Sequence, residues 1–250
     1  MNHVFFQLIY ICLGACKRGF LEACMPLIGL DGCHTKGPFS GQLLSVVGVD
    51  ANNCMYPIAY SIVEQENKET WSWFMGLLME DLSIESGKGW NFIIDRQKGL
   101  VQVLEQFILE AEYQYCVRHM YNNFNKKHKG EALRSERIRI LDVAAYEWLA
   151  NKRPQEWSRS HFGDHSKCEV LLNNWCELFN GTKMLLEARE KPIISCLEQI
   201  GKYLMRRWKL QLTHVGRWHG DIGDRVHKIL ERNKLQSCWC HAISNGYSQF

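Results

Sequence analysis

The sequence has little net charge, no long hydrophobic run, and no repeated or low-complexity segment. Its 250 residues carry 30 Lys and Arg against 27 Asp and Glu, and the resulting charge of +3 is too small to indicate a nucleic-acid partner by itself. A DNA-binding surface would therefore require local clustering of basic residues. The apolar stretch from Val4 to Cys16 is preceded by no Lys or Arg and is too short for a membrane span. We interpret that stretch as buried structure and expect a soluble protein without a membrane partner.

Apolar side chains and cysteine, by contrast, are abundant. Hydrophobic residues make up 46% of the chain and aromatic residues 12%, which is enough for a sizeable core in one large domain or two small ones. The 11 cysteines are odd in number and scattered. Because no secretory leader accompanies them, we interpret them as reduced thiols of an intracellular protein.

Alternating apolar runs and turn residues predict an α/β fold. We expect strands at Leu27–Asp31, Gln42–Val49, Met55–Val63, Trp90–Asp95 and Tyr113–Val117, and helices at Trp71–Leu82, Lys98–Phe107 and Tyr121–Lys129. The order β-β-β-α-β-α-β-α describes a mixed sheet with helices on its faces. Further helices are predicted at Asn173–Glu187 and Pro192–Trp208. Beyond Leu210 the periodicity fades, and we expect irregular or weakly strand-like structure to Phe250.

Two aspartates, Asp31 and Asp95, each follow a buried strand. Carboxylates at the ends of neighbouring strands can converge on one cation, and an acid from a helix would complete the set. Such a cluster suits two Mg²⁺ ions about 3.5–4 Å apart that activate a nucleophile and stabilise a leaving oxygen. An Asp after a strand is also a common turn former, so the pattern alone leaves both interpretations open.

Several strings resemble the Mutator-like element (MULE, MuDR-type) transposases of plants. They are LIGLDGCHTKG at 27–37, DANNCMYPIAYSIVEQENKETWSWF at 50–74, IDRQKGL at 94–100, YCVRHMYNNF at 115–124, LLNNWCELFN at 171–180 and LLEAREKPIISCLEQIGKYLMRR at 185–207. The resemblance runs through most of the chain, with the motifs in the order that the family has. It implies an RNase H-like fold and a DDE triad of Asp31, Asp95 and Glu177.

The family also implies an activity, a cofactor and partners. The triad would bind two Mg²⁺ (or Mn²⁺) ions and catalyse DNA cleavage at transposon terminal inverted repeats and transfer of the freed 3′-hydroxyl into target DNA. A protein with that activity would act in the nucleus. The resemblance leaves open whether the protein forms a homo-oligomer. The alternative is a domesticated, non-catalytic DNA-binding or regulatory protein derived from a transposase.

The resemblance suggests a domain plan with departures from the family. We expect a lead-in segment at 1–25, the first part of the core at 26–125, a shortened helical insertion at 126–166, catalytic helices at 167–210 and an irregular tail at 211–250, truncated before a SWIM-type zinc finger. Ile94 stands where the family commonly has a small polar residue. An N-terminal DNA-binding region is also missing, so we expect a truncated or decayed copy.

Cysteine, histidine and basic residues form three further candidate sites. Cys116 and His119 form a C-x-x-H pair that could begin a zinc site, but other ligands are not visible nearby, so we favour a supporting role by packing or hydrogen bonding. A Cys116–His119 catalytic dyad lacks a visible orienting group. The motif Cys238-Trp239-Cys240-His241 resembles half a zinc knuckle, with no second ligand pair. Candidate DNA contacts, or alternatively solvated helix faces, are Lys126, Lys127, Lys129, Arg206 and Arg207.

Overall fold

The computed structural model describes residues 8–37, 40–95, 98–116, 119, 173–218, 220 and 222–240, together with the isolated residues 143, 147 and 151. The predicted helix at Tyr121–Lys129 and nearly all of the predicted insertion at 126–166 lie outside these residues.

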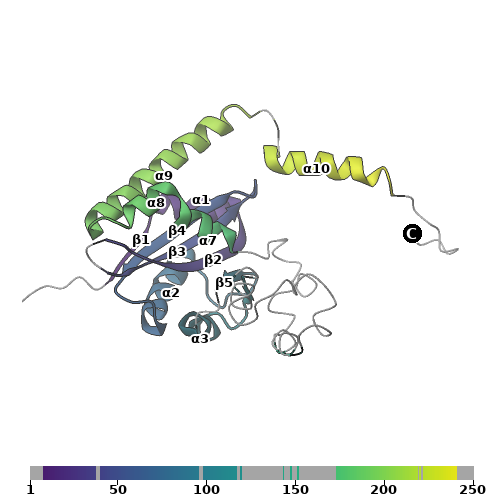
Figure 1. Ribbon diagram of the computed structural model, residues 1–250. Helices are drawn as coiled ribbons and strands as arrows, with labels where there is room; N and C mark the ends of the chain where they lie inside the picture. Colours follow the sequence, from purple (N-terminus) through teal and green to yellow (C-terminus); the bar gives the residue numbers. More distant parts are fainter. Residues whose placement is uncertain are drawn as a thin grey trace, which may run out of the picture.

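A mixed sheet forms the centre of the fold, as the sequence predicts, but the described residues give it six strands instead of the five expected (Figure 1). Its strands are β1 (Leu8–Cys12), β2 (Cys24–His34), β3 (Gln42–Asp50), β4 (Met55–Val63), β5 (Asn91–Ile94) and β6 (Glu112–Tyr115), in the spatial order β1-β4-β3-β2-β5-β6. The pairs β1–β4, β4–β3 and β3–β2 are antiparallel, whereas β5 pairs parallel with β2 and β6 pairs parallel with β5. The strand β2 therefore joins the antiparallel meander on one side to the parallel pair β5 and β6 on the other.

The segment expected as a lead-in contributes to this sheet. Its strand β1 pairs with β4 from Leu8 opposite Val63 to Cys12 opposite Ala59. The helix α1 (Gly14–Ala23) follows and buries Phe20 in the core. The run Leu-Ile-Tyr-Ile-Cys of β1 is rich in residues that favour a pleated, half-buried surface. The described part of the expected lead-in, residues 8–23, thus forms an edge strand and a packing helix of the same fold.

Two layers of helices cover the sheet (Figure 1). On one face, α2 (Lys68–Leu82) and α3 (Lys98–Phe107) bury an apolar cluster that includes Trp71, Phe74 and Leu104. On the other face lie α7 (Asn174–Gly181), α8 (Lys183–Ala188) and α9 (Ile193–Val215), which bury Phe179 and Ile200. The predicted helices in this part of the chain are confirmed, with a break at Thr182 between α7 and α8.

The expectation of irregular structure after Leu210 was wrong. The helix α9 continues to Val215, and α10 spans Asp224–Ser237. No residue of α10 is buried, so packing on the rest of the described fold contributes little to this helix. It is favoured instead by helix-forming residues and by a cap, because the side chain of Asn52 accepts a hydrogen bond from the backbone N–H of Arg225 at 3.0 Å. None of the described helices is long and apolar enough to cross a membrane.

Candidate active site

Parallel pairing of β2 and β5 brings the first two predicted acids side by side. Leu30 lies opposite Ile94 in this register, so the next residues, Asp31 and Asp95, are neighbours at one edge of the sheet. Asp95 follows β5, as expected. Asp31, however, lies within β2, whose pairing with β3 continues to His34, and the prediction that a strand ends at Asp31 was therefore wrong.

The close approach of α7 to β2 depends on a glycine. Side chains alternate along a strand, so Gly29 and Asp31 face α7, whereas Leu30 faces α2 and α3. A Cβ on Gly29 would collide with the side-chain oxygen of Asn173 and would lie 2.9 Å from the sulfur of Cys176. The side-chain amide of Asn173 also donates a hydrogen bond to the backbone carbonyl of Leu30 at 2.8 Å. Gly29 thus leaves the space in which α7 begins.

A second asparagine of α7 holds the Asp31 carboxylate. Asn180 donates from Nδ2 to Asp31 Oδ2 at 2.8 Å, and Ser45 on β3 donates to Asn180 Oδ1 at 3.2 Å. Burial raises the pKa of Asp31 to about 6, with the His119 charge and the Asn180 hydrogen bond opposing that rise and the Asp95 charge adding to it. A cation beside Asp31 would favour the ionised carboxylate, because opposite charge offsets the desolvation.

The imidazole of His119 lies between the other two predicted acids. Its Nδ1 is 3.9 Å from Asp95 Oδ1, and its Nε2 is 3.7 Å from Glu177 Oε1 on α7. A hydrogen bond with Cys116 raises the pKa of His119 to about 9; burial opposes the rise, and the Asp95 charge adds to it. For Cys116, burial raises the pKa of the thiol, but hydrogen bonds from His119 and from the Asn173 backbone together outweigh burial and lower it.

The three acids of the predicted triad do not close around a single point in this arrangement of side chains. Among the described Cys, His, Asp and Glu residues, the set with donor atoms all within 4.8 Å of one another is Cys116, His119 and Glu177. The structure therefore brings Asp31 beside Asp95, and it places Glu177 on the same face with His119 between it and Asp95.

Glu66 is a further acid at this edge, and sequence reasoning missed it. A Cβ on Gly32 would lie 2.8 Å from the carboxyl carbon of Glu66, so the glycine after Asp31 makes room for that carboxylate. The indole N–H of Trp71 donates to Glu66 Oε1 at 3.1 Å. Burial raises the pKa of Glu66; the Trp71 hydrogen bond opposes this, and the Asp95 charge adds to it. The usable sequence signal was an acid directly before the N-cap of α2.

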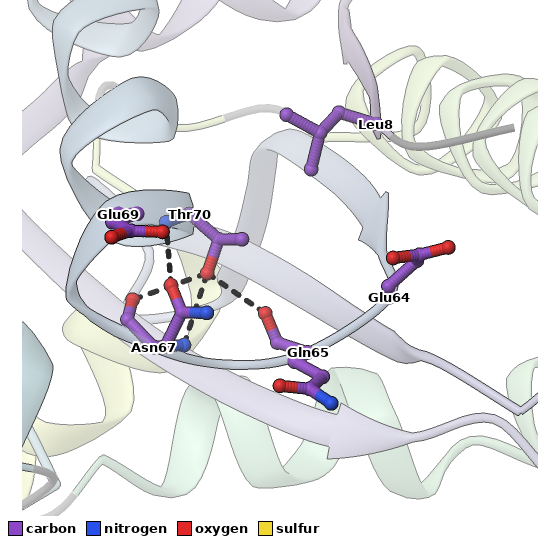
Figure 2. Close-up of a pocket in the computed structure, with 6 residues that line it drawn as sticks. All are labelled: Leu8, Glu64, Gln65, Asn67, Glu69 and Thr70. Atoms are coloured by element: carbon purple, nitrogen blue, oxygen red, sulfur yellow. Dashed lines mark hydrogen bonds between the residues drawn. The ribbon is translucent and has the colours of Figure 1, made fainter.

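The loop that carries Glu66 is fixed by a capping box at the start of α2 (Figure 2). Asn67 Oδ1 accepts from the backbone N–H of Thr70 at 2.9 Å, and Thr70 Oγ1 accepts from the backbone N–H of Asn67 at 3.0 Å. The Thr70 hydroxyl also donates to the backbone carbonyl of Gln65 at 2.9 Å. The backbone N–H groups of Asn67 and Thr70 are therefore both paired at the helix start, and the backbone on either side of Glu66 is held in place.

The predicted DNA contacts are only partly described. Lys126, Lys127 and Lys129 lie outside the described residues. Arg206 is exposed, whereas the half-buried Arg207 donates a hydrogen bond to the backbone carbonyl of Met55.

Arg207 also lies away from the acids. Met55 pairs with Val49 near the amino end of β2, and Asp31 lies near the carboxyl end of that strand. Arg207 thus ties α9 to the sheet away from the edge that bears the acids. In the predicted half knuckle, Cys238 and Cys240 are exposed at the end of α10, and His241 lies outside the described residues.

Comparison with known proteins gives one family match. Residues 27–123 match the model of the MULE transposase domain, a range that includes Asp31, Asp95, Cys116 and His119 but ends before Glu177. No curated protein matches the chain. Residues 27–123 of the chain are therefore similar to a MULE transposase domain.

Proposed function

We propose that the chain is the catalytic core of a DDE-type DNA transposase, which cleaves DNA strands and transfers the freed 3′-hydroxyl to target DNA. The observation that carries this proposal is the β2–β5 register, which makes Asp31 and Asp95 neighbours inside a MULE transposase domain. Transposition acts on genomic DNA, so the nucleus is the place of action and DNA is the partner.

An RNase H-like arrangement is part of the same proposal. Without the edge strand β1, the sheet consists of the meander β2–β3–β4 followed by β5 and β6, which add on the other side of β2 and run parallel to it. The acids then lie on the central strand β2, directly after its parallel neighbour β5, and on the helix α7 that packs on the same face. This support is topological and independent of the motif match.

Asp31, Asp95 and Glu177 are the residues that would hold Mg²⁺ or Mn²⁺. These ions prefer carboxylate oxygens, and bound ions supply charge stabilisation for the phosphoryl transfer. The buried Asp31, with its raised pKa, fits such a role because a cation would offset the cost of its burial. Within the protein, Asn180 orients the Asp31 carboxylate, and His119 lies beside the carboxylates of Asp95 and Glu177.

One observation favours a second function, that of a DNA-binding protein without catalysis. The carboxylates of Asp31, Asp95 and Glu177 are not all within 4.8 Å of one another, and His119 lies between two of them. A chain that keeps this arrangement when metal is present would bind DNA without cutting it. The two functions differ in whether the acids are needed for anything that the protein does to DNA.

Nicking of supercoiled plasmid and joining of a 3′-hydroxyl oligonucleotide test the proposal. Purified chain is incubated with Mg²⁺, with Mn²⁺ or with EDTA, and Asp31→Asn, Asp95→Asn and Glu177→Gln are compared with Glu198→Gln, which changes an exposed acid of α9. We expect metal-dependent nicking that falls by at least about 10³-fold in the three site variants, because each removes charge stabilisation of the transition state, and that persists in Glu198→Gln.

Nicking that survives Asp31→Asn would refute the catalytic assignment. Plasmid binding that is equal in wild type and Asp31→Asn, without nicking under any metal condition, would instead establish the non-catalytic function.

A further inference from the structure

We propose that Cys116, His119 and Glu177 bind a thiophilic divalent cation such as Zn²⁺, and that this ion withholds Glu177 from Mg²⁺. The second half of the proposal rests on the proposed transposase function, whereas binding of the cation does not.

The donor set is that of a three-ligand zinc site with an open position. One sulfur, one nitrogen and one oxygen atom lie within 4.8 Å of one another. Donors around a tetrahedral zinc ion, bonded at about 2.0–2.3 Å, are roughly 3.3–3.8 Å apart. The distance of 3.7 Å from His119 Nε2 to Glu177 Oε1 already falls in that range. A small side-chain adjustment would therefore bring all three donors to one ion.

Neighbouring groups support two of the three ligands. The backbone N–H of Asn173 donates to Cys116 Sγ at 3.2 Å, which orients the sulfur. With Nε2 turned to Glu177, the buried Nδ1 of His119 makes no hydrogen bond to any described residue and lies 3.9 Å from Asp95 Oδ1. A carboxylate behind a ligating histidine is the usual outer partner in zinc sites.

The fold supplies the ligand that the sequence did not reveal. Cys116 and His119 lie just after β6, whereas Glu177 comes from α7, far along the chain. The sequence alone favours a supporting role over zinc, because it reveals only two of the three ligands. Sulfur and imidazole select zinc-like ions, whereas Mg²⁺ prefers oxygen ligands. Glu177 is the one residue that both ions would use, so their binding should be competitive.

Titration of the full chain with Co²⁺, a coloured substitute for Zn²⁺, tests the site without any DNA. The protein carries Cys238→Ser and Cys240→Ser, so that the exposed thiols of the tail cannot contribute. We expect one Co²⁺ per chain with a thiolate-to-cobalt charge-transfer band, which Zn²⁺ removes by displacement. The band should be lost in Cys116→Ser and kept in the control Cys33→Ser.

A further variant guards against misfolding of Cys116→Ser. Glu177→Gln keeps the sulfur and should keep the band, while Co²⁺ affinity falls by about tenfold or more. Circular dichroism confirms that each variant is folded. Absence of the band in the wild-type site, or its persistence in folded Cys116→Ser, would overturn the binding proposal.

Competition is measured by plasmid nicking with the same protein. The Zn²⁺ concentration that halves nicking should rise in proportion to the Mg²⁺ concentration. Inhibition that is independent of Mg²⁺, or no inhibition where the cobalt band shows a filled site, would refute the shared use of Glu177. If no nicking occurs under any condition, the proposed function fails, and the cobalt titration still decides whether the cation binds.

Discussion

Both faces of the central sheet bury apolar clusters, and the face under α7 also holds polar groups. The face under α2 and α3 is closed by large apolar side chains, among them Trp71 and Phe74, which are both fully buried. The face under α7 places Gly29 and Asp31 on β2 and Ser45 on β3, where α7 meets them with asparagine side chains. Apolar burial stabilises both faces, and the α7 face in addition holds polar groups in fixed positions at a cost in stability.

Three buried polar side chains on the α7 face make hydrogen bonds that offset part of the cost of their burial, although Asn173 Oδ1 has no partner among the described residues. Ser45, Asn173 and Asn180 are all buried, and each makes a hydrogen bond to β2 or to a partner that contacts β2. An unpaired group in such a position would cost about 1–3 kcal/mol. The two faces should therefore respond differently to substitution.

The largest expected effect is on the α2 face. Phe74→Ala should lower the free energy of unfolding by about 3–5 kcal/mol, because it removes a fully buried ring from a packed cluster. Urea unfolding measures the change, with Leu109→Ala as the control, since Leu109 is 82% exposed. A loss below about 1 kcal/mol for Phe74→Ala would contradict the close packing of this face.

A smaller loss is expected where α7 approaches β2. Gly29→Ala should destabilise the protein by about 1–3 kcal/mol, because the added methyl group would displace Asn173 and Cys176. Gly201→Ala in α9 is the matched control, because a Cβ there would meet nothing within 4 Å. That control should stabilise the protein by up to about 1 kcal/mol through helix propensity. Equal effects of the two substitutions would contradict the role given to Gly29.

We expect Asp31 to be required for nicking and, when ionised, to lower the free energy of unfolding. Its pKa in the folded protein, about 6, is above the ordinary 3.8, so the folded state binds the proton more tightly than the unfolded state and the ionised carboxylate destabilises the fold. Without metal at pH 7.5, Asp31→Asn should therefore stabilise the protein by roughly 1–3 kcal/mol while abolishing nicking. The gain should shrink as the pH falls through about 6 toward 4. Thermal unfolding across this range measures it, and a pH-independent loss of stability would contradict the burial argument.

Sequence patterns predicted the parts of the fold that are stabilised by apolar burial. The meander, β5 and β6 were expected close to their observed positions, because their apolar runs are bounded by turn residues such as Asp50 to Asn53. Asp31 and Asp95 could be chosen as acids after strands, but their adjacency follows from the β2–β5 register, which no local pattern encodes.

Other parts could not be predicted for physical reasons. The helix α10 is exposed and is capped by Asn52 from a distant turn, a contact that no local pattern encodes. Asn180 and Glu66 depend on residues that are far away in sequence. Asn180 donates a hydrogen bond to Asp31, and the Glu66 carboxylate occupies the space beside Gly32. Glu177 came from resemblance to a family. Its nearness to Cys116 and His119 required the fold.

Binding of Mn²⁺, measured by electron paramagnetic resonance, tests the central claim most directly, since it needs no knowledge of the DNA sequence. Mn²⁺ prefers oxygen ligands and should bind wild-type protein at the carboxylates of Asp31, Asp95 and Glu177. The account predicts that Asp31→Asn and Asp95→Asn each weaken Mn²⁺ binding by at least about tenfold, while Glu198→Gln leaves it unchanged. Equal Mn²⁺ affinity in wild type, Asp31→Asn and Asp95→Asn would contradict the assignment of this edge of the sheet as a metal-dependent active site.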